Sequence, residues 1–158
     1  MTFDEAIEIL TAFHRAGVDY VVVDSMAMAA HGLPRATQDL DVFIGPKREN
    51  IEKVKEVLGA LFDDPEVDQI DAEELMGTYP AVQYIPPHQR WSLDLLTRLG
   101  EAFRYEDLGV ETIDVGGTPI RVATPATLFR MKSDTVRPQD RADALRIQEA
   151  FDVEDDRS

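Results

Sequence analysis

Two aspartates separated by one leucine are the first residues of this chain that could do chemistry. Asp39 and Asp41 open the segment 39–44, whose other residues are apolar and predict a β-strand. Alternate side chains of a strand lie on one face, so these carboxylates project together, roughly 6–7 Å apart. They repel each other unless a cation lies between them, and Mg²⁺ prefers such oxygen ligands. A solvated strand end is the competing interpretation, because the pattern is short and common.

A third carboxylate occurs later in the chain, within a second apolar segment. Asp94 is the central residue of the segment 92–96, which predicts a strand with Ser92, Asp94 and Leu96 on one face. An aspartate inside an apolar strand is costly unless it is paired or bound to a metal. Asp94 is therefore a candidate partner for the first two aspartates.

The residues before the aspartate pair are suited to binding an anion. An apolar strand is predicted at 20–23 and a short helix at 26–30, with Ser25 between them. A hydroxyl and free N–H groups at a helix N-terminus suit a phosphate. His31 either contacts a nucleotide or caps its helix. Arg35 either binds phosphate through its bidentate fork or forms an ion pair with an aspartate.

The elements that must position these residues predict an α/β (α+β) fold, with a small mixed sheet flanked by helices. A capping box at Thr2 and Glu5 begins a helix that Gly17 ends, and a second amphipathic helix is predicted at 49–61. The acidic segment 63–74 predicts a solvated loop. Strands at 82–85 and 92–96 precede a C-terminal β-hairpin at 111–122 and two helices at 125–133 and 138–151. We expect one domain over residues 1–151 and an acidic tail at 152–158.

Composition narrows the functional class. The 158 residues carry a net charge of −15, which disfavours nucleic acid and anionic membranes as partners and favours small molecules or proteins. No apolar run reaches the roughly 18–20 residues of a membrane span. The acidic start lacks the basic residues of a signal peptide, and the chain contains no cysteine. We therefore expect a cytoplasmic protein.

Several of these residues fall into a pattern that resembles a known family. The segment 20–44 contains an apolar strand, a short helix, H-G-x-x-R-x-T and D-L-D, and a later segment reads K-x(4)-R-x-x-D-x-x-D. This resembles the minimal nucleotidyltransferases of the DNA polymerase beta superfamily, in the bacterial AbiEii-like and MNT-like branch. The matching residues are His31, Gly32, Arg35, Thr37, Asp39, Asp41, Asp94, Lys132, Arg137, Asp140 and Asp143.

The resemblance implies a nucleotidyltransferase fold and a metal-dependent reaction. Such enzymes move a nucleoside monophosphate from an NTP to a hydroxyl acceptor, here a protein, an RNA or a small molecule. By motif match, Asp39, Asp41 and Asp94 would be catalytic and would hold two Mg²⁺ ions. The residues that the resemblance places near the nucleotide are Asp24, Ser25, His31, Arg35, Thr37 and Lys132. It also implies a toxin–antitoxin role, with an antitoxin protein or a second copy of the chain as candidate partners.

Asp24 departs from the family pattern, which has a glycine there. A carboxylate about 5 Å from a triphosphate charge costs roughly 3 kcal/mol at an effective dielectric constant near 20. Asp24 could instead cap the helix, act as an extra metal ligand, or inactivate the site. The last case gives the alternative function, a catalytically silent nucleotidyltransferase-fold protein that binds a partner or ligand.

Lys132 also has two interpretations. It either reaches the triphosphate or the third carboxylate, or it forms a buried ion pair with Asp140 or Asp143.

Overall fold

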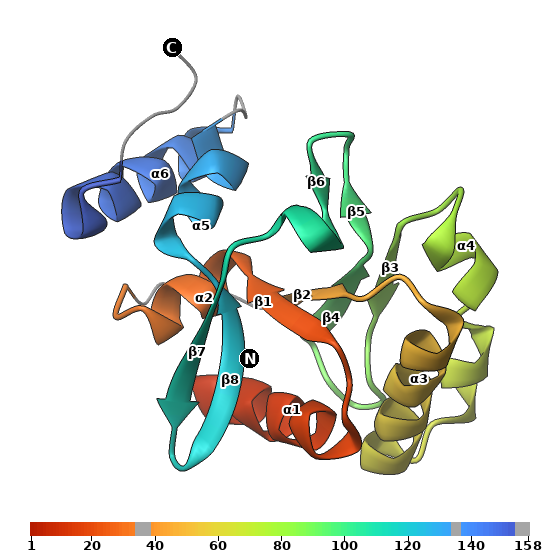
Figure 1. Cartoon of the computed structure of the whole chain (residues 1–158). Helices are drawn as coiled ribbons and strands as arrows, with labels where there is room; N and C mark the ends of the chain where they lie inside the picture. The colour runs from red at the N-terminus through yellow and green to blue at the C-terminus, as the bar shows by residue number, and fades with distance from the viewer. Residues whose placement is uncertain (34–38, 134–136, 154–158) are drawn as a thin grey trace.

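A mixed six-stranded sheet organises the computed structural model, which describes residues 1–33, 39–133 and 137–153. The strand order is β3-β4-β2-β1-β8-β7 (Figure 1). Neighbouring strands are parallel in the β2–β4 and β1–β8 pairs and antiparallel in the other three. The strands are β1 (Tyr20–Val23), β2 (Asp39–Ile44), β3 (Ala81–Tyr84), β4 (Ser92–Leu96), β7 (Val110–Val115) and β8 (Thr118–Ala123).

The central strands are the core of the molecule. All four residues of β1 are buried, and so are the apolar residues of β2. In β2, the two aspartates keep partial exposure while Leu40 and Val42 are fully buried. The alternation read from the sequence therefore holds, and it places both aspartates on the same face of the sheet.

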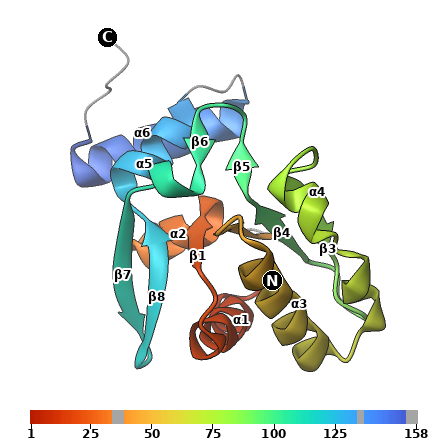
Figure 2. The ribbon, with the colours of Figure 1, turned by 45° about the vertical axis from the view of Figure 1, so that its right-hand side comes forward.

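Two pairs of helices lie at opposite ends of the molecule. The helices are α1 (Phe3–Ala16), α2 (Asp24–Ala30), α3 (Arg48–Phe62), α4 (Ala72–Met76), α5 (Pro125–Ser133) and α6 (Pro138–Phe151). Figure 2 shows α1 and α3 side by side at one end, and the α5–α6 pair at the other. The predicted capping box at Thr2 and Glu5 begins α1, and Gly17 ends it with a left-handed backbone.

The predicted C-terminal β-hairpin and two helices are confirmed as β7–β8, α5 and α6. A small second hairpin, β5 (Arg98–Leu99) with β6 (Phe103–Arg104), projects toward α5 (Figures 1 and 2). The guanidinium of Arg130 on α5 lies 5.5 Å from the ring centroid of Phe103. This contact joins the small hairpin to the C-terminal helices.

Two local predictions are wrong. The acidic segment 63–74 is not a simple loop, because it contains a 3-10 helix (Pro65–Gln69) and α4. Asp64 and Asp71 accept hydrogen bonds from the first backbone N–H groups of these turns, so their acidity serves to cap helices. The segment 103–108, for which the sequence predicts neither helix nor strand, holds β6 and a 3-10 helix (Tyr105–Asp107).

Across the described ranges, every helix is too short or too polar to cross a lipid bilayer.

Candidate active site

Asp41 on β2 lies directly opposite Asp94 on β4, because these parallel strands pair in that register. The two carboxyl groups hydrogen-bond to each other. We call Asp41 and Asp94 the carboxylate pair. Both line a cavity of about 470 Å³, whose other lining residues include Asp24, Asp140, Lys132, Arg137, Gln83 and the apolar side chains of Val23, Ala81, Val82, Leu96, Leu99, Leu128 and Met131.

The carboxylate pair cannot easily carry two negative charges. Burial, together with the nearby carboxylates of Asp24 and Asp94, raises the pKa of Asp41 to about 8. Burial and the charges of Asp39 and Asp24 also raise the pKa of Asp94, although the hydrogen bond from Asp41 acts in the opposite direction. At neutral pH the metal-free pair therefore shares a proton, which Asp41 donates to Asp94. A cation would remove the need for that proton.

Asp39 is held beside the pair by a serine. The Ser92 hydroxyl donates to Asp39 Oδ1 at 2.7 Å and lies 3.3 Å from Asp94 Oδ1. Gln83 Nε2 in turn donates to Ser92 Oγ at 3.3 Å. Ser92 thus connects the first and third aspartates across the paired strands β2 and β4.

Asp24 begins α2 with a left-handed backbone, φ +60°, a conformation that aspartate tolerates better than most residues. The N-cap position is Val23, and no side chain caps this helix, so the N-cap interpretation of Asp24 is wrong. Its carboxylate instead accepts a hydrogen bond from Lys132 Nζ at 2.5 Å and also contacts Asp41. Asp24 therefore links α2 to the C-terminal helices.

Lys132 is buried among three carboxylates. Its ammonium group lies 2.5 Å from Asp24 Oδ1, 3.0 Å from Asp140 Oδ1 and 3.3 Å from Asp143 Oδ2. Burial alone would lower the pKa of Lys132, but the charges of Asp24 and Asp140 raise it. The ion pair considered from the sequence is present with both Asp140 and Asp143. We call these four residues the lysine cluster.

Comparison with known proteins identifies the family. A family model described as nucleotidyl transferase AbiEii toxin, type IV toxin–antitoxin system, matches residues 25–154. The chain belongs to this AbiEii nucleotidyltransferase family. No curated protein matches the chain.

Solved structures of nucleotidyltransferases resemble this chain in fold. The protein in the crystal structure of ANT(2'')-Ia in complex with adenylyl-2''-tobramycin is 12% identical to this chain in sequence. The two structures superpose over 94% of this chain and 88% of that one, with a TM-score of 0.58. A nucleotidyltransferase from Thermotoga maritima, described as putative in its own name, is 13% identical, with 93% and 91% coverage and a TM-score of 0.56. At these identities the likeness establishes the fold, which agrees with the predicted architecture.

The residues that the sequence analysis singled out are only partly gathered at the cavity. Those that line it are Asp24, Asp41, Asp94, Lys132, Arg137 and Asp140, and Asp39 adjoins them through Ser92. Arg35 and Thr37 lie outside the described residues.

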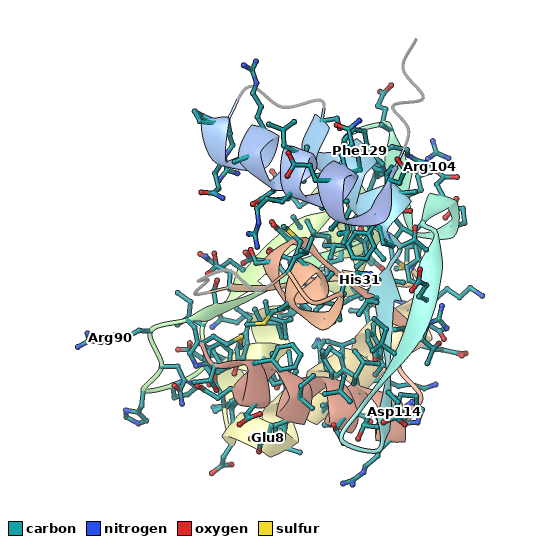
Figure 3. All side chains as sticks on the ribbon, turned by 90° about the vertical axis from the view of Figure 1, so that its left-hand side faces the viewer. Glu8, His31, Arg90, Arg104, Asp114 and Phe129 are labelled. Atoms are coloured by element: carbon teal, nitrogen blue, oxygen red, sulfur yellow. The ribbon has the colours of Figure 1, made fainter. Side chains whose placement is uncertain are left out.

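Ser25 and His31 are absent from the residues that line the cavity. Ser25 is buried, with its hydroxyl 3.5 Å from Asp24 Oδ1. His31 lies on the side of α2 that faces the β7–β8 hairpin (Figure 3). Its Nε2 is 2.8 Å from the carbonyl oxygen of Ala123, and its ring meets Phe151 edge-on. His31 thus fastens α2 to β8 and α6.

Sequence reasoning missed Ser92 and Gln83 as parts of the site. The available signal was weak: Ser92 lies two residues before Asp94 and therefore on the same strand face. Its contact with Asp39 depends on the register of β2 and β4, which the sequence does not reveal.

The oxygen ligands at this site fit a magnesium ion whose remaining ligands are waters and substrate phosphates. Within the described part of the chain, no group of three or more His, Cys, Asp or Glu side chains is arranged to hold a metal by itself. Ser92 holds Asp39 and Lys132 holds Asp24, which leaves the carboxylate pair facing each other. Mg²⁺ commonly binds through one or two carboxylates together with waters and substrate phosphates. The carboxylate pair on the cavity wall is the part of this site that could supply those two ligands.

Proposed function

We propose that this protein is a Mg²⁺-dependent nucleotidyltransferase that moves a nucleoside monophosphate from an NTP to a hydroxyl acceptor. The observation that supports this most strongly is the carboxylate pair, which lies in register on adjacent strands and shares a proton in a cavity of about 470 Å³. A buried pair of this kind gains most from a divalent cation. Membership of the AbiEii family supports nucleotidyl transfer as the reaction.

In this proposal Asp39, Asp41 and Asp94 would hold two Mg²⁺ ions. Bound there, the ions would supply positive charge that offsets the phosphates and the entering and leaving oxygens. Asp94 also takes the proton of the acceptor hydroxyl, whose oxygen then bonds to the α-phosphorus of the NTP. The bond between the α-phosphorus and the bridging oxygen breaks, and pyrophosphate leaves.

Cations and N–H donors of the chain would hold the nucleotide. Lys132 and Arg35 are the proposed contacts to the phosphates, with Ser25, His31 and Thr37 as further candidates. Among those of the five that the structure describes, Lys132 lines the cavity with the carboxylate pair. The apolar side chains of the cavity wall suit a base or sugar.

The acceptor is a protein, an RNA or a small molecule bearing a hydroxyl group. The structural neighbour in complex with adenylyl-2''-tobramycin carries an adenylylated small molecule, which makes a small-molecule acceptor worth testing here. The net charge of −15 disfavours RNA. We further propose a toxin–antitoxin role, as in the family description, with an antitoxin protein or a second copy of the chain as partner.

Transfer of label from α-³²P-labelled NTPs tests the proposal. The protein would be incubated with Mg²⁺ and each NTP, alone and with candidate proteins, RNAs and hydroxylated small molecules. We expect a labelled acceptor with the native protein and none with Asp41→Asn or Asp94→Asn. Asp107→Asn, at an exposed position away from the cavity, should behave as the native protein. Transfer that persists in the Asp41 variant would exclude this function.

A second candidate is a catalytically silent nucleotidyltransferase-fold protein that binds a partner or ligand. The ion pair between Asp24 and Lys132 favours it, because it occupies a cation that could otherwise meet a phosphate. Asp24→Gly separates the two functions. Transfer that appears only in this variant would identify a silenced enzyme, whereas transfer by both proteins would show that Asp24 is compatible with catalysis.

A further inference from the structure

Three carboxylates surround the ammonium group of Lys132. Its nitrogen donates hydrogen bonds to Asp24 at 2.5 Å and to Asp140 at 3.0 Å, and it forms an ion pair with Asp143 at 3.3 Å. A phosphate that binds Lys132 must therefore compete with these carboxylates. The structure thus raises the question of which carboxylate gives way.

Exposure distinguishes the three carboxylates. The side chain of Asp24 is 36% exposed, whereas those of Asp140 and Asp143 are 8% and 0% exposed. Asp140 and Asp143 belong to α6, while Asp24 belongs to α2. Asp24 is therefore the carboxylate that an incoming anion displaces at least cost.

A second cation lies at the same part of the cavity. Arg137 lines the cavity, its side chain is 76% exposed, and its Nε is 3.8 Å from Asp140 Oδ2. That distance and exposure make a weak ion pair, so the guanidinium can turn toward a ligand. Its planar fork binds phosphate through two parallel hydrogen bonds. Arg137, which directly precedes α6, and Lys132 on α5 therefore place two cations on the wall of the same cavity.

We propose that Lys132 and Arg137 form a phosphate subsite and that Asp24 occupies it in the nucleotide-free protein. Asp24 is then a specificity-determining residue, because only a ligand with enough phosphate charge, or one brought by bound cations, can displace it from Lys132. This inference rests on the proposed function and adds to it the residue that competes with the NTP phosphates for Lys132. A nucleoside without phosphates does not compete with Asp24.

The test measures phosphate binding separately from catalysis. Tripolyphosphate in EDTA, the Mg²⁺ complex of a non-hydrolysable ATP analogue, and adenosine would each be titrated calorimetrically into three proteins. These are the native chain, Asp24→Asn and the control Asp63→Asn. Asn also tolerates a left-handed backbone, so Asp24→Asn removes the charge and keeps the conformation. Asp63 has the same left-handed backbone, φ +47°, and lies outside the cavity, so its variant loses an equal charge elsewhere.

We expect Asp24→Asn to bind tripolyphosphate about tenfold or more tightly than the native chain, because one opposing charge near the ligand is gone. Asp63→Asn should match the native chain, and adenosine should bind all three proteins equally. Adding Arg137→Gln, an exposed substitution, to Asp24→Asn should reverse the gain for tripolyphosphate. Asp24→Gly should show the same gain if the asparagine variant fails to fold.

Three results would overturn the inference, and they separate it from the proposed function. Equal binding of tripolyphosphate and of the Mg²⁺ nucleotide by all three proteins would exclude competition by Asp24 but leave the nucleotidyltransferase standing. Tripolyphosphate binding by none of them, with the Mg²⁺ nucleotide still bound, would place the phosphates away from Lys132. Failure of every protein to bind the Mg²⁺ nucleotide would exclude both.

Discussion

The carboxylate pair and the lysine cluster lie on the same cavity and solve the same electrostatic problem in different ways. In the lysine cluster, three carboxylates surround Lys132 at hydrogen-bonding or ion-pairing distance. In the carboxylate pair, Asp41 and Asp94 face each other and share a proton, because burial and nearby carboxylates raise the pKa of Asp41 to about 8. One group of acids carries its own cation, and the other holds a proton in place of one.

This difference indicates which aspartates are structural and which are available to a ligand. Asp140 and Asp143 are tied to Lys132 and are almost fully buried, so their role is to hold α5 to α6. The carboxylate pair needs a positive charge from outside the chain. Asp24 belongs to both regions, since it binds Lys132 and contacts Asp41. The composition alone, rich in acidic residues, does not reveal this division.

The largest effect should come from removing one member of the carboxylate pair. Asp41→Asn keeps the size of the side chain but removes a charge that would hold both Mg²⁺ ions. We expect nucleotidyl transfer to fall about a thousandfold or more, because metal-ion catalysis supplies several kcal/mol. Initial rates of label transfer at saturating Mg²⁺ measure the loss.

The control is Asp107→Asn, which removes an exposed aspartate from the 3-10 helix before β7. It should retain the native rate. A native rate in Asp41→Asn would mean that the carboxylate pair is not where the reaction occurs, and the contrast between the two regions would lose its functional meaning.

Sequence reasoning predicted the fold well where local patterns dominate. The alternation in residues 39–44, the capping box before α1 and the Gly116–Gly117 turn between β7 and β8 each determine their own conformation. It failed in the segment 63–74, where charge was read as solvation. There, Asp64 followed by Pro65, and Asp71 followed by a helix-forming run, were capping signals that local physical chemistry could have revealed.

The candidate site was less predictable, because its contacts are distant in sequence. Asp41 and Asp94 meet through a strand register, and Asp24 and Lys132 are 108 residues apart. The sequence identified these residue types and their motif, but it left the role of Asp24 open among several possibilities. The left-handed backbone of Asp24 and its ion pair are tertiary features, so only the structure could exclude the helix cap.

The second largest effect should come from the lysine cluster and should concern stability. Lys132→Met leaves Asp140 and Asp143 buried without their cation, so we expect the free energy of unfolding to fall by about 3–5 kcal/mol. For a chain of this length that lowers Tm by about 10 °C. Urea unfolding and calorimetry measure both quantities.

A matched control is the exposed ion pair of Arg48 with Glu73, whose atoms lie 2.7 Å apart. Arg48→Met should lower the free energy of unfolding by no more than about 1 kcal/mol, since solvent screens exposed pairs. Equal effects of the two substitutions would contradict the structural role assigned to the lysine cluster.

The next effect concerns pH and should set the carboxylate pair apart from the lysine cluster. Between the ordinary value of 3.8 and about 8, folded Asp41 keeps a proton that the unfolded chain releases. The folded state then binds more protons, so the metal-free protein loses stability as pH rises through this range. Mg²⁺ competes with that proton, so its stabilising effect on Tm should be larger at about pH 8 than at about pH 6.

Thermal unfolding with EDTA or with Mg²⁺, compared between the native chain and Asp41→Asn, tests this. The difference between the two proteins cancels the titration of the three histidines. A pH dependence that is identical in both proteins would show that Asp41 ionises normally.

The smallest of these effects should come from Ser92, which positions the acids without being one. Its hydroxyl donates to Asp39 at 2.7 Å and lies 3.3 Å from Asp94. Ser92→Ala leaves every carboxylate in place but frees Asp39 to rotate, so we expect a loss of about tenfold in transfer rate, in the range seen for residues that orient metal ligands. The loss should shrink as the Mg²⁺ concentration is raised, because the weakened step is metal binding.

Thr112→Ala removes a hydroxyl from the exposed edge strand β7 and should change neither the transfer rate nor its dependence on Mg²⁺. A loss in Ser92→Ala that is independent of Mg²⁺ would mean that the serine acts on the acceptor or on folding, and that Asp39 does not depend on it for its position in the site.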